Sequence, residues 1–484
     1  MTTQDDREKL FRLQGLEIFG EAARPARRRR PPGTVHEPAR ETPVFAETDV
    51  LVVGGGPAGV AAAVGAARLG ADVTLVERYN HLGGLSTGGL VIWIDRMSDW
   101  TGRHIIRGVA DELMDRLPRD AIFGPARDVW GARDEATAAY WMQRTAAFHG
   151  VVTWSPTIDP EWLKTACMDM VLGSKVRLFL HAWAVAPIAD GGHVQGAIFE
   201  SKEGRQAIRA RVVVDASGDA DLFARAGAAL DSDIDERDIH HCTNTAWLFG
   251  GVDMDRWIAF RTGDPKGFSD FMARGRERLR FFEKPFVGWR NEVALFMGPR
   301  LSGYSAVDVD DLTTVEIQSR QLMVGHLEVY RAHAPGFEQA YLMLGAPQIG
   351  VRHSRRLRGL RRVTQAQWET GRVWDDEIGV SPSLSPRAPN ISVPYGSLVP
   401  VDLEGILGPG RHISCDAASH TFLREIPQCW MTGQAAGIAA ALAAARSTRL
   451  RDLDPRAIQR ELLRQGAYLS PAVEGALRSP AAAI

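Results

Sequence analysis

A glycine-rich turn lies between an apolar run and a stretch of small residues. The turn has the spacing Gly54-x-Gly56-x-x-Gly59, and a second apolar run closes with Glu77. In such a unit the first glycine permits a tight turn, the second lets backbone approach a pyrophosphate, and the third lets helix and strand pack closely. The N-terminus of the following helix offers free N–H groups to phosphates, and the carboxylate can accept hydrogen bonds from a ribose diol. The spacing therefore predicts a dinucleotide site.

Further glycine-rich segments indicate which dinucleotide binds. The chain carries one such fingerprint, so a separate domain for a nicotinamide dinucleotide is not visible. Glycines recur at 83–84 and 88–89, and residues 215–219 close another apolar run. Several returning segments suit a long cofactor, so we predict FAD rather than NAD. The expected contacts in these segments are Gly54, Gly56, Pro57, Ala58, Gly59, Glu77, Arg78, Gly83, Gly84, Leu85, Ser86, Ser217, Gly218 and Asp219.

Local patterns predict the elements that hold these residues. Apolar runs at 50–53 and 71–77 are expected strands on either side of a helix over 57–69. A second helix is expected over 159–172, because Asp159 can cap it and Pro160 suits its first turn. Four short strands separated by turns should form a β-meander over 175–181, 182–188, 194–201 and 207–216. The remaining expected elements are a helix over 7–19, strands near Val399 and over 412–414, and a helix over 428–445.

Composition describes an ordinary globular protein. Of the 484 residues, 45% are hydrophobic and 24% charged, and 57 Lys and Arg nearly balance 59 Asp and Glu. This balance favours no nucleic-acid and no membrane partner, and the basic run 27–30 is interpreted as a solvated arm. The four cysteines have no C-x-x-C spacing and the N-terminus lacks a signal-peptide pattern, so we expect no metal site and a cytoplasmic location.

Several of these segments resemble a known family. The chain is similar to the FAD-dependent oxidoreductases that share the flavin domain of the glutathione reductase and succinate dehydrogenase/fumarate reductase superfamily. The arginine-rich stretch 350–359 resembles a family motif, with His353 where a glutamate usually stands. Arg424-x-x-Pro427, followed by Gly-Gln-Ala-Ala-Gly, is also family-like. The matching stretches are 49–78, 82–89, 210–227, 346–359, 393–400, 410–442 and 453–469.

The resemblance implies further cofactor contacts. A helix beginning at Gly433, Gln434 and Gly437 would point its positive end at the flavin pyrimidine and stabilise the negative charge that reduction places there. Asp416 lies where related flavoproteins place an acidic residue on the ribityl chain, although those usually show Gly-Asp and this chain has Cys-Asp. By analogy, Val185 would offer backbone hydrogen bonds to adenine.

The patterns and the resemblance together predict an α/β fold with a discontinuous cofactor domain. We expect a Rossmann-like FAD-binding domain of three-layer ββα architecture, with an inserted mixed α+β substrate domain. The predicted parts are an N-terminal arm over 1–45, the FAD-binding domain over 46–230 and 396–470, the substrate domain over 231–395 and a tail over 471–484. A homo-oligomer is compatible with this arrangement.

Candidate reacting residues lie in the family-like motifs. Dehydrogenation of an alcohol or amine requires a base near the carbon that gives up hydride, and histidine titrates near neutrality. His420 and His353 are the candidates, and for each the alternative is a structural hydrogen bond. Arg424 is expected to hold flavin O2 or a substrate carboxylate, or else to pair with a core carboxylate. Arg352 belongs to an arginine cluster that is either an anion site or a solvated face.

Three other features leave alternatives open. His81 lies close to the flavin loop and raises covalent attachment, although non-covalent binding is the default. Six of the 13 tryptophans lie between positions 93 and 162, where core packing is favoured over an aromatic pocket. The pair His240-His241 is not expected to enter the site.

The predicted function is an FAD-dependent oxidoreductase that moves a hydride between a small organic substrate and flavin N5. Oxidation of a C–OH or C–N bond is favoured, with oxygen or a carrier as electron acceptor. The alternatives are a C=C reductase, as in the fumarate reductase branch, and a monooxygenase. A non-enzymatic alternative is an FAD-binding structural or RNA-modification subunit, against which the balanced charge argues.

Overall fold

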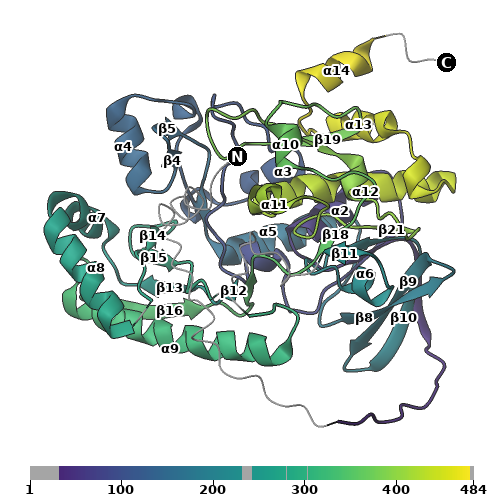
Figure 1. The fold of residues 1–484 in the computed structure, drawn as a ribbon, viewed down its shortest axis with the longest axis horizontal. Helices are drawn as coiled ribbons and strands as arrows, with labels where there is room; N and C mark the ends of the chain where they lie inside the picture. Colours follow the sequence, from purple (N-terminus) through teal and green to yellow (C-terminus); the bar gives the residue numbers. More distant parts are fainter. Residues whose placement is uncertain (1–31, 232–242, 280, 302–303, 480–484) are drawn as a thin grey trace.

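The computed structural model describes residues 32–231, 243–279, 281–301 and 304–479, and its largest sheet has the strand order β7-β2-β1-β10-β9-β8 (Figure 1). Strands β7, β2, β1 and β10 run parallel, β8 and β9 continue antiparallel from β10, and β21 lies parallel beside β10. The strands are β1 (Val44–Val53), β2 (Val73–Val76), β7 (Arg177–Phe179), β8 (Trp183–Asp190), β9 (His193–Ser201), β10 (Gly204–Asp215) and β21 (Ile406–Leu407). This is the predicted Rossmann-like α/β fold.

Strand β10 joins the parallel and antiparallel parts of this sheet. Residues 204–209 pair with β9, residues 207–215 pair with β1, and residues 213–214 pair with β21. The predicted meander is therefore correct for β8, β9 and β10 but wrong for β7, which pairs in parallel with β2. Strand β1 begins at Val44, inside the predicted arm, while the predicted helix over 7–19 and the basic run 27–30 lie outside the described residues.

Helices α2 (Pro57–Ala67) and α12 (Ile426–Arg446) pack against each other over the parallel strands (Figure 1). Both are rich in alanine and glycine, so their backbones can approach closely. Three more helices pack around this pair: α3 (Val109–Asp115), α5 (Pro160–Gly173) and α13 (Pro455–Arg464). Helix α5 begins as predicted, because the Asp159 carboxylate accepts the Glu161 N–H at 2.9 Å and Pro160 follows the cap.

A second, antiparallel sheet lies within the predicted substrate domain. Its order is β14-β15-β13-β16, from β14 (Phe286–Val287), β15 (Val293–Phe296), β13 (Trp247–Gly250) and β16 (Tyr341–Gly345). Three helices lie along one side of it (Figure 1): α7 (Met254–Gly263), α8 (Pro265–Leu279) and α9 (Val309–His333). Alternate residues of β13 separate two cores: Trp247 and Phe249 pack with the α7–α9 helices, whereas Leu248 joins the core around α2 and α12. The domain boundaries at 231 and 396 stay a prediction.

The return of the chain to the first sheet differs from the prediction. The returning strand is β21, and neither Val399 nor residues 412–414 lie in a strand. Residues 412–414 instead exchange backbone hydrogen bonds with three separate segments, because Leu357 and Val363 donate to His412 and Ser414, and Ser414 donates to Ser397. The predicted tail contains helix α14 (Pro471–Arg478).

The other elements are short and connect these layers. In the described part of the chain, no helix is both long and apolar enough to cross a lipid bilayer. The short elements are β3 (Ile122–Phe123), α4 (Glu135–Gln143), β4 (Ala147–Phe148), β5 (Val151–Val152), β6 (Thr157–Ile158), α6 (Asp221–Arg225), β11 (Leu230–Asp231), β12 (Thr243–Asn244), β17 (Gly350–Val351), β18 (Arg356–Leu357), α10 (Gln365–Trp368), β19 (Glu377–Ser381), β20 (Ile391–Pro394) and α11 (Ala417–Leu423).

Candidate active site

The fingerprint turn connects β1 to α2 and leaves the start of α2 without a side-chain cap. Gly54 has φ +97°, and a Cβ there would lie 2.6 Å from the Ala216 carbonyl oxygen. At Gly59 a Cβ would overlap the Gly54 carbonyl oxygen. At Gly56 the nearest atom to a Cβ would be 4.0 Å away, so this side of the turn is open. Uncapped helix N–H groups beside open space form the cradle that a pyrophosphate requires.

Glu77 lies at the end of β2 and is engaged by backbone. Its side chain accepts the Gly55 N–H at 2.6 Å and the Tyr79 N–H at 2.8 Å, and the residue is buried. The next residue, Arg78, lies over the rings of Tyr79 and Trp183. The carboxylate is therefore oriented beside the turn, and its contact with a ribose stays a prediction. Val185 lies where the β8–β9 ladder shifts register between Ala184 and Ala186, which is compatible with its predicted backbone contacts to adenine.

The second glycine loop folds onto the first. Gly83 and Gly84 have φ +93° and +50°, and Gly83 donates its N–H to the Gly55 carbonyl at 2.8 Å. A Cβ at Gly84 would lie 2.8 Å from the Gly56 Cα, so only glycine allows this approach. Leu85 and Ser86 follow in a short turn, with the Ser86 hydroxyl donating to the Gly83 carbonyl at 2.7 Å.

Residues 217–219 are tied to a buried ion pair. The Asp219 carboxylate accepts hydrogen bonds from Arg411 at 2.7 Å and from the Ser354 hydroxyl at 2.6 Å. Burial favours the neutral acid, but Arg411 and the Ser354 hydrogen bond outweigh it and hold the pKa of Asp219 below its ordinary value. Ser217 and Gly218 lie beside this pair, since the Arg411 side chain donates to the Gly218 carbonyl at 2.9 Å. Their contacts with a cofactor stay predictions.

The helix start at Gly433 that the resemblance implied is wrong, whereas the helix predicted over 428–445 is correct to within two residues. Helix α12 begins at Ile426, so Gly433, Gln434 and Gly437 lie inside it. A Cβ at Gly433 or Gly437 would overlap a carbonyl oxygen of α2, and the Gln434 amide contacts Val109 N–H and Gln465. These three residues serve helix packing. The positive end of α12 lies seven residues earlier than predicted, which is the position that can face a flavin ring.

Asp416 lies at the start of α11 and is oriented by backbone. Its carboxylate caps the helix by accepting the Ser419 N–H at 2.9 Å. The other carboxylate oxygen accepts the Gln365 N–H at 2.8 Å. Each oxygen can accept a further hydrogen bond, so the contact of Asp416 with the ribityl chain stays a prediction.

The two candidate histidines lie together. The rings of His353 and His420 have centroids 4.8 Å apart at 81°, and both residues are 2% exposed. His420 Nε2 is 3.0 Å from the Arg411 carbonyl oxygen, so this nitrogen carries the proton and donates. Burial, followed by the neighbouring His353, Arg424 and Arg356, places the pKa of His420 well below its ordinary value. His420 is therefore neutral near pH 7 and a weak proton acceptor.

The two candidate arginines face carboxylates. Arg424 pairs with Glu425 at 3.0 Å, directly before α12, which agrees with the alternative that assigned Arg424 a carboxylate partner. Arg352 is near Glu283 on the second sheet's side. Burial raises the pKa of Glu283 to about 7, although Arg300, the Gly298 N–H and Arg352 oppose this shift. Arg352 therefore lies near enough to Glu283 to influence its charge, and its role as an anion site or a solvated residue stays a prediction.

Sequence reasoning missed Asp95. Its carboxylate lies 3.1 Å from the Arg96 guanidinium, with 16% of the side chain exposed. Burial is the largest influence and raises the pKa of Asp95; Arg96 opposes the shift, and the nearby Glu425 adds to it. Asp95 therefore lies close to the start of α12. The available signal was the adjacent pair Asp95 and Arg96 within the apolar run 90–97, because charged side chains are rarely buried unless they are paired.

An unsatisfied polar atom at the same helix end fits a flavin. Gln428 is 3% exposed and donates to the Ser381 hydroxyl at 3.0 Å. Among the residues that the structure describes, none donates a hydrogen bond to its buried Oε1. A flavin ring offers an N–H donor, and the helix end stabilises the negative charge of the reduced ring. The turn at Gly56 and the helix end at Gln428 thus suit the pyrophosphate and the flavin ring of one FAD.

Comparison with known proteins identifies the family. A family model described as FAD dependent oxidoreductase matches residues 49–462. The chain belongs to this family. Membership establishes FAD as the cofactor and an oxidoreductase as the class of enzyme.

Individual relatives are more distant. Two digeranylgeranylglycerophospholipid reductases from Methanopyrus kandleri are 27% and 29% identical, over 43% and 46% of this chain and 46% and 50% of their own. The chain therefore spans about half the length of these curated relatives. A solved structure of a geranylgeranyl bacteriochlorophyll reductase-like protein from Thermoplasma acidophilum is 14% identical, with a TM-score of 0.42 over 86% of this chain and 82% of that one.

Proposed function

We propose that this oxidoreductase reduces a carbon–carbon double bond in an apolar substrate. The observation that carries the proposal is the position of the Asp95 carboxyl group, which is 16% exposed and lies beside Arg96 near the start of α12, where burial raises its pKa. The names of the relatives, which are reductases of isoprenoid lipids, support the same direction. This choice reverses the direction that the sequence favoured, because burial shifts Asp95 toward the acid form and shifts His420 away from accepting a proton.

Reduction of an alkene adds a hydride to one carbon and a proton to the other. When bound and reduced by a two-electron donor, FAD supplies the hydride. Asp95 donates the proton to the second carbon and leaves a carboxylate, which the adjacent Arg96 guanidinium stabilises. The Arg96 guanidinium is itself fixed by a hydrogen bond of 2.9 Å to the Ser383 carbonyl. The carboxylate then regains a proton from solvent.

Oxidation of an alcohol or amine would instead need a proton acceptor. His420 is a weak one, since its pKa lies well below the ordinary value and its Nε2 already donates to a carbonyl. The T-shaped contact with His353 fixes both rings. We therefore assign the histidine pair to positioning at the site and Asp95 to proton transfer.

The first experiment sets the direction of the reaction. The holoenzyme is reduced anaerobically with dithionite and mixed with geranylgeraniol or with its fully saturated analogue. We expect flavin absorbance to return only with the alkene, and mass spectrometry to show a product heavier by two hydrogens. The proposal is wrong if no alkene reoxidises the flavin while alcohols or amines bleach the oxidised enzyme.

A second experiment tests Asp95. In Asp95→Asn we expect unchanged FAD content and alkene-driven reoxidation slowed about 100-fold or more, the usual contribution of general acid catalysis. The wild-type rate should fall as pH rises through the pKa of Asp95, since the protonated form is lost. The variant should not show this decrease in rate. Asp128→Asn, at an exposed position, is the matched control and should behave as wild type. A normal rate and pH profile in Asp95→Asn would remove the residue from the mechanism.

A further inference from the structure

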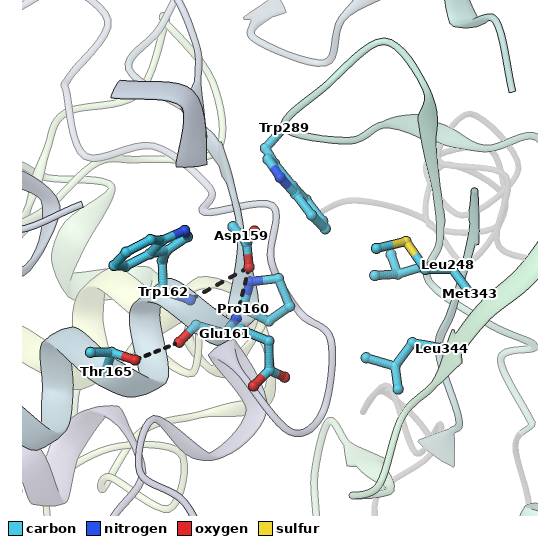
Figure 2. Close-up of a pocket in the computed structure, with 9 residues that line it drawn as sticks. All are labelled: Asp159, Pro160, Glu161, Trp162, Thr165, Leu248, Trp289, Met343 and Leu344. Carbon is cyan, nitrogen blue, oxygen red and sulfur yellow. Dashed lines mark hydrogen bonds between the residues drawn. The ribbon is translucent and has the colours of Figure 1, made fainter. Parts of the chain in front are cut away.

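A cavity of about 260 Å³ lies between the start of α5 and the edge strand β16 (Figure 2). Figure 2 shows the first turn of α5 on one side, residues of the second sheet on the other, and the indole of Trp289 between them. The cavity is lined by Asp159, Pro160, Glu161, Trp162, Thr165, Leu248, Trp289, Met343 and Leu344. Its lining includes no residue of the fingerprint turn and neither candidate histidine, so the functions described above do not account for it.

The sheet side of the cavity is hydrocarbon. Leu248 and Leu344 are paired across β13 and β16, and Leu248 is fully buried. The ladder shifts register after this pair, because Phe249 is opposite Leu342 and Met343 is left over. A β-bulge of this kind changes the orientation of the extra residue's side chain. Met343 and Leu344, although adjacent in the strand, therefore both line the sheet side of the cavity. The polar cap of the opposing helix is already satisfied, since Asp159 accepts the N–H groups of its own first turn.

Large apolar side chains at the rim remain exposed. Trp162 is 47% exposed and Met343 is 44% exposed. Neighbouring exposed apolar surfaces of this kind mark ligand or partner sites, because covering them removes apolar area from water. An apolar ligand that entered the cavity would cover both.

The cavity is adjacent to the flavin loop. Strand β16 ends at Gly345, and three residues later Gln348 donates its backbone N–H to the Gly88 carbonyl at 3.0 Å. The Gln348 amide is also 3.1 Å from His81 Nε2, next to the loop that contains Gly83 and Gly84. A chain that lies along β16 is thus directed from the cavity toward the cofactor.

We infer that this cavity binds one end of the substrate's hydrocarbon chain, while the reacting double bond lies at the cofactor. The inference rests on the proposed function. Its volume is below the roughly 300–1,000 Å³ of sites that enclose a whole drug-sized ligand, so it holds a segment of the chain. The site should therefore distinguish substrates by chain length.

The binding experiment does not depend on turnover. Oxidised holoenzyme is titrated with 12-bromododecanol, whose bromine quenches nearby tryptophans. We expect saturable quenching, a large part of which disappears in Trp162→Phe. Trp183→Phe is the matched control, because Trp183 is 51% exposed and lies on β8. Quenching that does not saturate, or that falls equally in both variants, would overturn the inference.

The kinetic experiment uses a variant in which a larger side chain fills the cavity. Leu344→Trp should lower kcat/KM for geranylgeraniol at least tenfold and leave the shorter geraniol unaffected. Leu342→Trp, at a 39% exposed position of the same strand outside the lining, should change neither. Equal losses for both alcohols would overturn the inference. Saturable quenching at Trp162 without alkene turnover would instead contradict the proposed function alone, and turnover without such quenching would contradict the site alone.

Discussion

At the scale of single residues, Glu77 connects cofactor binding to the local backbone. Its carboxylate orders the Gly55 and Tyr79 amides, and the same group is predicted to bind the FAD ribose. A substitution here should affect cofactor affinity before it affects the fold.

We expect Glu77→Gln to weaken FAD binding at least tenfold, because the amide cannot accept hydrogen bonds on both of its terminal atoms. Fluorescence titration of the FAD-free protein with FAD measures the change. Glu203→Gln, in an exposed turn before β10, should bind FAD as wild type does. An unaltered affinity in Glu77→Gln would show that this carboxylate serves only the turn.

At the scale of elements, the contact between α2 and α12 determines where the cofactor can lie. Gly433 and Gly437 of α12 meet the backbone of α2, so the two helices are closer than side chains would permit. This contact fixes the position of α12, whose start lies near Asp95.

Gly437→Val should destabilise the protein, because its side chain would overlap the Ala62 carbonyl oxygen. We expect a loss of about 1–3 kcal/mol or more in the free energy of unfolding, measured in urea. Gly475→Ala in α14 is the control: a Cβ there meets nothing within 4 Å, so the change should gain about 0.5–1 kcal/mol. Equal stabilities in the two variants would contradict the packing role.

The start of the same helix was predicted less accurately. Helix α12 has no side-chain cap; the local pattern predicted it over 428–445, within two residues of its bounds, while the resemblance placed a helix start at Gly433. The structure extends α12 back to Ile426, where Pro427 occupies the first turn. In contrast, α5 has a capping Asp159 and a Pro160 beside it, and its start was predicted correctly.

At the scale of the whole molecule, buried histidines couple stability to pH. His326 is fully buried and its Nδ1 donates to the Leu322 carbonyl at 2.7 Å, while Nε2 accepts the Glu283 N–H at 3.2 Å. Protonation of His326 Nε2 would place its N–H against the Glu283 N–H, so that two hydrogen-bond donors would face each other. Burial lowers the pKa of His326 to about 4, against a backbone hydrogen bond that raises it.

Because this pKa is lower in the folded than in the unfolded protein, the stability contribution is complete above about pH 6.5 and is lost as pH falls toward 4. At pH 5 the loss amounts to roughly 2 kcal/mol. Urea unfolding at pH 7 and pH 5 should show a smaller pH difference in His326→Gln than in wild type. His333→Gln, exposed on the same helix, should keep the wild-type difference. A wild-type pH difference in His326→Gln would contradict this coupling.

Cofactor binding should also stabilise the whole molecule. The purified protein is expected to be yellow and to release FAD on denaturation. At FAD concentrations 100-fold above Kd, binding to the folded state adds about 2.7 kcal/mol, which thermal denaturation with and without FAD would detect. A colourless protein whose melting temperature does not change when FAD is added would contradict cofactor binding.

Features that depend on neighbours along the chain could be predicted from the sequence. The glycine turn at Gly54, the strands on either side of it, Glu77 and the capped helix α5 are local, and so they were predicted with the fold class and the cofactor. Features that depend on segments far apart in the chain became visible only in the folded protein. Strand β7 pairs with β2, Asp95 is near Glu425, and Leu248 faces α5 across a cavity. Burial and charge at these places arise from the packing of distant segments, which no local pattern records.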